Sequence, residues 1–97
     1  MITVSWTTRA QDDLAAIHAY VSRDSPHYAS VVIRGLLAAV GRLTEFPQSG
    51  RAVPEFANPT VREVVRPPYR IVYRVVSASE IHVLTVHHGA RAFPEEL

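Results

Sequence analysis

The stretch VREVVRPPYRIVYRVVSASEIHVLTV, residues 61–86, carries the clearest information about the fold. Its apolar residues recur at every second position, and β-branched and aromatic side chains dominate it, a pattern typical of β-strands with one buried face. We therefore predict three strands, over residues 61–66, 69–76 and 81–86. Because Pro67-Pro68 and residues 77–79 leave room only for tight turns, consecutive strands must run antiparallel.

The residues before this stretch predict two helices. Thr8 and Gln11 form a capping-box pattern, and apolar residues then follow at helical spacing to about Arg23. Ser25-Pro26 supplies an N-cap and a first-turn proline for a second helix, which a proline and a glycine within residues 46–50 bring to an end. The apolar stripe of this second helix consists of Ala29, Val32, Ile33, Leu36, Leu37, Val40 and Leu43. Since the two helices almost adjoin, they must fold back on each other as a hairpin.

The two ends of the chain complete the predicted fold. Residues 2–6 alternate between apolar and polar side chains and predict a short N-terminal strand, whereas residues 89–97 predict an irregular tail. The order of elements predicts an α+β fold, with an N-terminal strand and an α-helical hairpin packed on an antiparallel β-sheet. A chain of 97 residues suffices for one hydrophobic core, so we expect a single domain over residues 1–97.

Composition narrows the class of protein. Hydrophobic residues make up 47% of the chain and charged residues 20%, which is ordinary for a globular protein. The net charge of +1 gives no strongly basic field, although all 10 basic residues are arginine. The lack of cysteine excludes disulfides and thiolate sites and fits a reducing compartment. No leader pattern and no run of the roughly 20 apolar residues of a membrane span is present, so we expect a cytoplasmic protein without membrane insertion.

Arginine is the side chain that the predicted strands offer most often to a ligand. Strand alternation puts Arg70 and Arg74 on one face, opposite the apolar residues of their strand, and puts Arg62 and Arg66 together on the preceding strand. We expect a cationic surface on an uncovered face of the sheet, suited to phosphates or carboxylates. The alternative is that these arginines only solubilise an exposed face. Cross-strand register decides which arginines share a face, and it is not readable from the sequence.

Two histidines, His87 and His88, close the last predicted strand. At least one imidazole should therefore stand beside the strand arginines, where it either moves protons near neutral pH or satisfies loop backbone groups. Histidines and carboxylates do not occur at a metal-ligand spacing, so we predict no metal site. The sequence also contains no glycine-rich phosphate loop, dinucleotide fingerprint or nucleophilic serine motif, and we expect no cofactor.

Several short strings resemble the RelE/ParE toxin superfamily of type II toxin-antitoxin systems across essentially the whole chain. Those of the first half are Trp6, Asp13-Leu14, Ser25-Pro26, Phe46-Pro47, Gly50-Arg51 and Val53-Pro54-Glu55. Those of the second half are Arg62-Glu63, Tyr69-Arg70-Ile71-Val72-Tyr73 and Val86-His87-His88-Gly89-Ala90-Arg91. Each string is short, but their shared order in so short a chain identifies it as similar to this superfamily.

The resemblance implies a partner. Members are made beside a cognate antitoxin, ParD-like or RelB-like, whose C-terminal segment folds onto the toxin in a hetero-oligomer and blocks it. Such segments are amphipathic and acidic, so the expected footprint includes the helical hairpin and basic residues. The arginines that we assign to binding the antitoxin or the target are Arg62, Arg66, Arg70, Arg74 and Arg91.

The resemblance also implies one of two activities. ParE-like members inhibit DNA gyrase without known catalysis, whereas RelE-like members cut messenger RNA on the ribosome. For an RNA-cleaving toxin, Arg70 would supply the cation, His88 the acid, and Glu55 or Glu63 the base. The ending His88-Gly89-Ala90-Arg91 and the lack of lysines and of a tail tyrosine favour the ParE-like activity, so we expect a gyrase inhibitor. The alternatives are a ribosome-dependent mRNA endoribonuclease and a non-toxic α+β interaction module.

Overall fold

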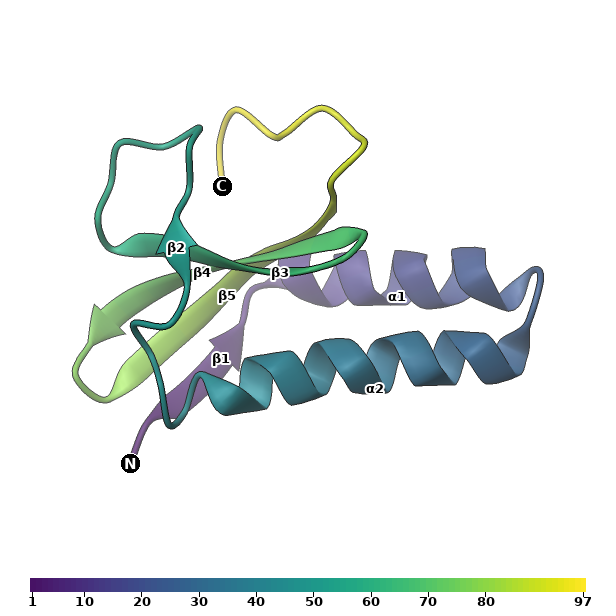
Figure 1. The fold of residues 1–97 in the computed structure, drawn as a ribbon, viewed down its shortest axis with the longest axis horizontal. Helices are drawn as coiled ribbons and strands as arrows, with labels where there is room; N and C mark the ends of the chain where they lie inside the picture. The colour runs from purple at the N-terminus through teal and green to yellow at the C-terminus, as the bar shows by residue number, and fades with distance from the viewer.

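Three long strands form the centre of a five-stranded sheet in the computed structural model, which describes residues 1–97. They are β3 (Val61–Arg66), β4 (Tyr69–Ser77) and β5 (Glu80–His88), and each pairs antiparallel with the next (Figure 1). β3 has the predicted range, β4 ends one residue later than predicted, and β5 begins one residue earlier and ends two residues later. The period-two pattern of residues 61–86 therefore predicted the centre of the sheet correctly.

The two edge strands differ from the expected antiparallel arrangement. At one edge β1 (Thr3–Trp6) pairs with β5 and runs parallel to it. At the other edge β2 (Arg51–Ala52), a strand of only two residues that the sequence did not reveal, pairs antiparallel with β3. The sheet order is β1-β5-β4-β3-β2, so the sheet is mixed. A parallel pair is possible here because the helical hairpin separates β1 from the other strands and carries the chain across the sheet.

The predicted hairpin consists of α1 (Thr8–Ser22) and α2 (Pro26–Arg42). Ser25 caps α2 as expected, since its side chain accepts a hydrogen bond from the backbone N–H of Tyr28. The cap of α1 is Thr7 and not the predicted Thr8, because Thr7 Oγ1 accepts from the backbone N–H of Ala10 at 3.1 Å. Neither helix is both long and apolar enough to cross a membrane.

The main hydrophobic core lies between the hairpin and one face of the sheet. It joins α1 and α2 to β4 and β5 through Ala10, Leu36, Ala39, Val40, Tyr69, Ile71, Val83 and Val86. Leu37, predicted to widen the buried stripe of α2, is 46% exposed. The hairpin extends past the turn between β3 and β4, so its far half has no sheet beneath it (Figure 1).

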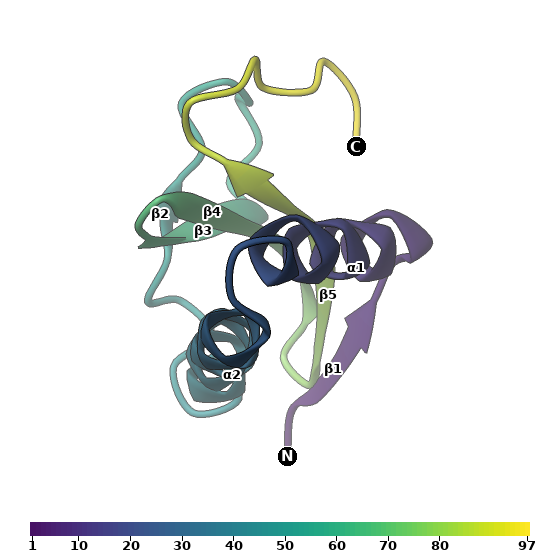
Figure 2. The same ribbon diagram turned by 90° about the vertical axis from the view of Figure 1, so that its right-hand side faces the viewer.

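The opposite face of the sheet carries a second, smaller core and is not the uncovered surface that we expected. Val61, Val72 and Leu84 of the strands pack there with Val53, and Phe56 and Phe93 cover this cluster from outside. These covering residues come from the loop after β2 and from the C-terminal tail, which lie together on the side of the sheet away from α2 (Figure 2). The tail has no helix or strand, as predicted.

Candidate functional site

Strand register divides the four strand arginines between the two faces of the sheet. Arg62 lies opposite Tyr73, and Arg70 lies opposite Val65. Arg62 and Arg66 therefore share the helix-side face with the core residues of β4, whereas Arg70 and Arg74 lie on the far face with Val72. The four arginines therefore do not form one cationic surface, because the register, which the sequence left open, places each pair on a different face.

Arg70 is held by two carboxylates on the far face. Its Nε donates to Oε1 of the fully buried Glu63 at 2.7 Å. Its two terminal nitrogens bind Glu55 as a fork, at 2.9 and 2.7 Å. The second oxygen of Glu63 accepts from Arg51 Nε at 2.7 Å, so two arginines and two glutamates form one compensated network. The side chain of Arg70 is only 14% exposed, which leaves little of its guanidinium available to a ligand.

Aromatic side chains complete this network, which we call the Arg70 cluster (Arg70, Glu55, Glu63, Arg51, Phe93 and His87). The guanidinium of Arg70 lies 4.3 Å from the centre of the Phe93 ring, a cation-π contact. His87 lies opposite Arg70 in the sheet, and its ring meets Phe93 edge-on at 5.2 Å. The imidazole that the sequence placed beside the strand arginines is thus present, and it belongs to His87.

His88, the predicted acid, lies elsewhere. It faces Tyr69 on the helix side of the sheet, with ring centres 5.5 Å apart. Consecutive strand residues point to opposite faces, so His88 cannot share the face that Arg70 occupies. The structure therefore brings Glu55 to Arg70 but does not bring His88 to either of them.

Electrostatics make Glu55 a poor proton acceptor. Its hydrogen bonds to Arg70 lower its pKa from 4.5 to about 2. The same bonds to Glu55, and those to Glu63, raise the pKa of Arg70 above its usual value. A general base works best when its pKa lies near the working pH, so Glu55 as it stands is several pH units too acidic for that role.

The remaining predicted arginines have separate environments. Arg62 donates from Nη1 to the backbone oxygen of Gly50 at 2.9 Å, and its buried Nε has no partner. Arg74 reaches Thr60 Oγ1 at 3.5 Å. Arg66 extends over α2, where its guanidinium lies against Gly35. Arg91 is exposed in the tail beside the end of β5.

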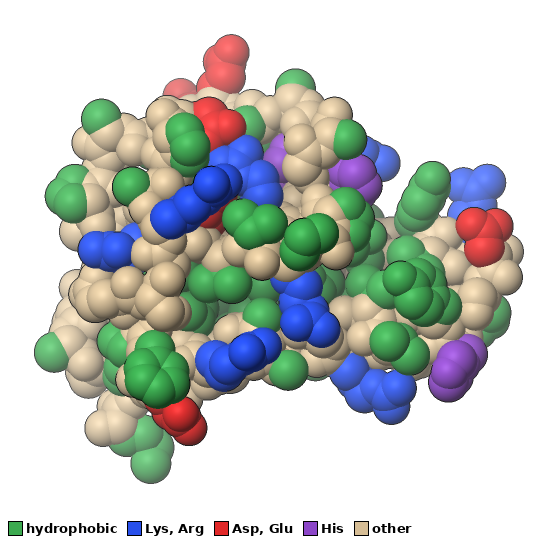
Figure 3. Space-filling model, viewed as in Figure 1, with side chains coloured by type: hydrophobic (Ala, Val, Ile, Leu, Met, Phe, Trp, Pro, Cys, Tyr) green, Lys and Arg blue, Asp and Glu red, His purple; other side chains and the backbone are tan.

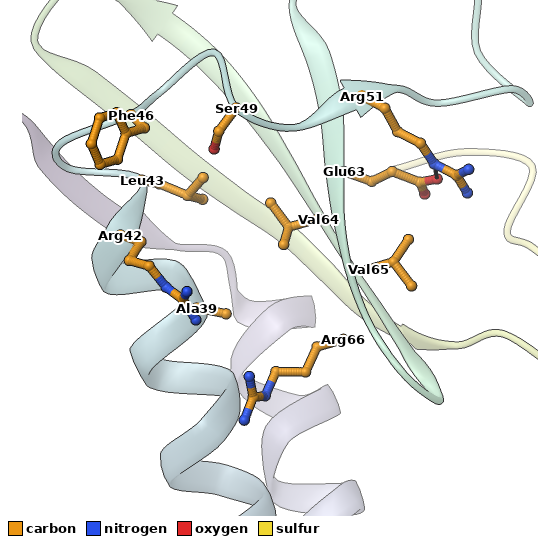
Figure 4. Close-up of a pocket in the computed structure, with 10 residues that line it drawn as sticks. All are labelled: Ala39, Arg42, Leu43, Phe46, Ser49, Arg51, Glu63, Val64, Val65 and Arg66. Atoms are coloured by element: carbon orange, nitrogen blue, oxygen red, sulfur yellow. Dashed lines mark hydrogen bonds and ion pairs between the residues drawn. The ribbon is translucent and has the colours of Figure 1, made fainter.

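A groove that the sequence did not predict runs between α2 and the edge of the sheet. It has a volume of about 530 Å³, and we call it the edge groove. Its apolar lining includes Leu43, Phe46 and Val65, and Arg42 and Arg66 stand along it (Figure 4). Arginine side chains follow the boundary between the sheet and α2 in the space-filling view (Figure 3).

The backbone along this groove has unused hydrogen-bonding groups. β2 pairs only with Arg62 and Glu63, so the edge of β3 from Val64 to Arg66 has no neighbouring strand. Edge strands of this kind are ready to pair with an added segment. The sequence could not show this feature, because it depends on how short β2 is.

The buried polar contacts of Asp13 and Glu63 were not predicted from the sequence. Asp13 Oδ2 accepts from the Thr85 hydroxyl and, at 3.0 Å, from the backbone N–H of Val86, which ties α1 to β5. Glu63 was considered only as a possible base, although it is a buried anchor for two arginines. Charged residues are rarely buried within a strand unless they are paired with an opposite charge. This rule could have predicted that Glu63 pairs with arginines.

Comparison with known proteins adds a family likeness over nearly the whole chain. The sequence profile described as "ParE toxin of type II toxin-antitoxin system, parDE" matches residues 4–93. The chain is 40% identical to "Toxin RelE2" of Caulobacter vibrioides, over 94% of this chain and 99% of the relative. It is 38% identical to "Putative toxin Y4kP" of Sinorhizobium fredii, over 97% and 95% of the two chains.

Solved structures resemble the fold as well. A chain of the "Chromosomal ParDE TA system from P. aeruginosa" matches with a TM-score of 0.72 and 28% identity, over 91% of this chain and 96% of that one. A chain of the toxin-antitoxin complex RelBE2 from Mycobacterium tuberculosis matches with a TM-score of 0.59 over 90% and 96%, at 24% identity, and shows the fold alone. These similarities agree with the superfamily resemblance noted from the sequence.

Proposed function

Because this chain belongs to the ParE toxin family of type II toxin-antitoxin systems, we propose that it inhibits growth by binding DNA gyrase, without catalysis of its own. A cognate antitoxin would neutralise it. The names of its relatives include both ParE and RelE, so they do not choose between the two activities. The choice rests on the state of the Arg70 cluster.

The Arg70 cluster supports a binding role over RNA cleavage. Cleavage by a 2′-hydroxyl needs a base, an acid and an unpaired cation around one phosphate. Here Glu55 occupies the fork of Arg70, and the pKa of Glu55 is about 2. His88, the expected acid, lies on the other face of the sheet. The Arg70 cluster instead forms a compact, charge-compensated contact between the sheet, the loop after β2 and the C-terminal tail.

The edge groove supports an antitoxin site. An extended acidic segment could pair with the backbone of β3 from Val64 to Arg66 and place its carboxylates near Arg42 and Arg66. Its apolar side chains would cover Phe46 and Val65, which are 60% and 47% exposed. Of the five arginines predicted to bind partners, Arg66 is the one that this groove offers.

The first experiment is induced expression of the chain in a bacterium that lacks the antitoxin, with pulse labelling of DNA and protein synthesis within one generation. We expect DNA synthesis to fail and DNA damage to appear while translation continues. Early loss of translation with cuts in message at the ribosome would contradict the proposal and favour the endoribonuclease. Unimpaired growth would favour the non-toxic interaction module.

Matched variants separate binding from catalysis. Glu55→Gln keeps the shape of the side chain but removes the solvent-exposed one of the two candidate bases beside Arg70, the other being the buried Glu63, so a binding inhibitor should keep its toxicity. His87→Ala removes the imidazole that lies opposite Arg70. A loss of growth inhibition of about 100-fold or more in both variants, the usual effect of removing a general acid or base, would point to catalysis.

A further inference from the structure

A second pocket lies on the opposite side of the hairpin from the edge groove. It has a volume of about 470 Å³ and is formed by α1 and the end of β5, where the tail leaves the sheet. In Figure 2, α1 lies next to this end of β5. The pocket is lined by Asp13, Ala16, Ile17, Tyr20, Tyr69, Val86, His87, His88, Ala90 and Arg91, and we call it the α1 pocket.

The polar groups that this pocket offers are mainly hydrogen-bond donors. Arg91 takes part in none of the ion pairs of the chain. His88 Nδ1 accepts from the backbone N–H of Ala90 at 3.1 Å, so the neutral ring carries its proton on Nε2 as a further donor. Burial raises the pKa of the Tyr69 phenol, which keeps that hydroxyl protonated. Asp13 is the only acid here, and its Oδ2 already accepts from Thr85 and Val86.

Aromatic residues give the same pocket an apolar wall. Tyr20 is 62% exposed, and Tyr69 packs edge-on against His88. Arg23 lies 5.9 Å from the centre of the Tyr20 ring, so a second cation stands near the rim. Exposed tyrosine beside arginine is the composition that dominates the energetic centres of protein-protein interfaces.

We propose that the α1 pocket is the contact site for the protein target of this toxin and receives an acidic side chain with an apolar neighbour. Arg91 and His88 would bind the carboxylate, and Tyr20 and Ile17 would pack on the apolar group. This inference rests on the proposed function, because it assumes a protein target. It leaves the edge groove to the antitoxin, so the two partners would use opposite sides of the hairpin.

The test measures two affinities of each variant, one for purified DNA gyrase and one for the cognate antitoxin. Tyr20→Ala and Arg91→Ala should each weaken gyrase binding by at least about tenfold, as expected for central interface residues. Binding of the antitoxin should be unchanged. Both side chains are exposed, so the variants should fold, and thermal unfolding checks this.

Matched controls use the other helix. Tyr28→Ala removes a tyrosine of similar exposure, 57%, and Arg34→Ala removes an exposed arginine of α2, and neither residue lines the α1 pocket. Both controls should bind gyrase like the unmodified chain. Equal loss in the controls and the pocket variants would overturn the inference, because the contact would then not be centred on this pocket.

The remaining outcomes also decide the matter. If the unmodified chain binds gyrase and the pocket variants bind equally well, the inference fails while the proposed function stands. If the pocket variants lose the antitoxin, the surface belongs to that partner and the inference fails. If the unmodified chain does not bind gyrase, the proposed target is wrong. The pocket variants and the controls are then compared by growth inhibition instead of by gyrase affinity. Loss of inhibition only in the pocket variants would still support a target site there.

Discussion

Glu55 binds Arg70 through both carboxylate oxygens, at 2.9 and 2.7 Å, and so occupies the fork with which an arginine would hold a phosphate or a partner's carboxylate. The loop after β2 supplies Glu55, and the centre of the sheet supplies Arg70. This pair joins a segment without regular structure to the far face of the sheet. It also explains why a strand arginine that the sequence marked for binding is largely buried.

The Glu55–Arg70 pair should make stability depend on pH in the acid range. The bond to Arg70 lowers the pKa of Glu55 from 4.5 to about 2, so its stabilisation is complete above about 4.5 and is lost as the pH falls toward 2. Denaturant unfolding from pH 6 to pH 2 should show the unmodified chain losing more stability than Glu55→Gln. The matched control is Glu95→Gln in the exposed tail. If Glu55→Gln and the unmodified chain lost stability in parallel, the pair would contribute nothing to folding.

Glu63 should be far more important for folding than its exposed partner Arg51. Its side chain is fully buried between two arginines. Glu63→Gln leaves Arg51 and Arg70 with Glu55 as their one carboxylate and should cost about 3–5 kcal/mol of unfolding free energy, as breaking a buried ion pair does. Arg51 is 62% exposed, and Arg51→Ala should cost roughly 0–1 kcal/mol. Urea unfolding of the two variants measures both values. Similar costs for the two would contradict this assignment.

Tyr73 should stabilise the loop between α2 and β2 through its hydroxyl. The hydroxyl donates to the backbone oxygen of Pro47 at 2.8 Å and accepts from the backbone N–H of Gly50 at 2.9 Å. Tyr73→Phe leaves both groups without that partner and should lower the unfolding free energy by about 1–3 kcal/mol. Tyr28→Phe, at an exposed position, should have no measurable effect. An equal change in the two variants would show that the hydroxyl contacts do not matter.

Gly35 should be needed for the position of Arg66 in the edge groove. A Cβ at Gly35 would lie 2.8 Å from a terminal nitrogen of Arg66, so Gly35→Ala forces that guanidinium to move. We expect antitoxin affinity to fall by about fivefold, equivalent to one contact of roughly 1 kcal/mol. The control is Gly41→Ala, where a Cβ meets nothing within 4 Å. It should keep the affinity and raise stability by about 0.5–1 kcal/mol, the usual gain within a helix. Full affinity in Gly35→Ala would remove Arg66 from the antitoxin site.

Periodicity in the sequence determined the three central strands and the two helices, and their order with short motifs determined the family. These features are local, since a turn, a cap or an alternating pattern is complete within a few neighbouring residues. The caps illustrate the limit of that reasoning. Ser25 was identified correctly, whereas the α1 cap shifted by one residue to Thr7, because adjacent threonines offer equivalent hydroxyls.

Only the tertiary structure decided which side chains meet. Alternation along each strand puts Arg70 on the same face as Arg74, and Arg62 on the same face as Arg66. The β3–β4 register then places these two pairs on opposite faces of the sheet. The same parity rule put His87 and not His88 beside Arg70. Register, the parallel edge of β1 and the covering tail all depend on contacts between residues far apart in the chain. Such contacts leave no local pattern, so the sequence determined the elements and the family, and the packing determined the sites.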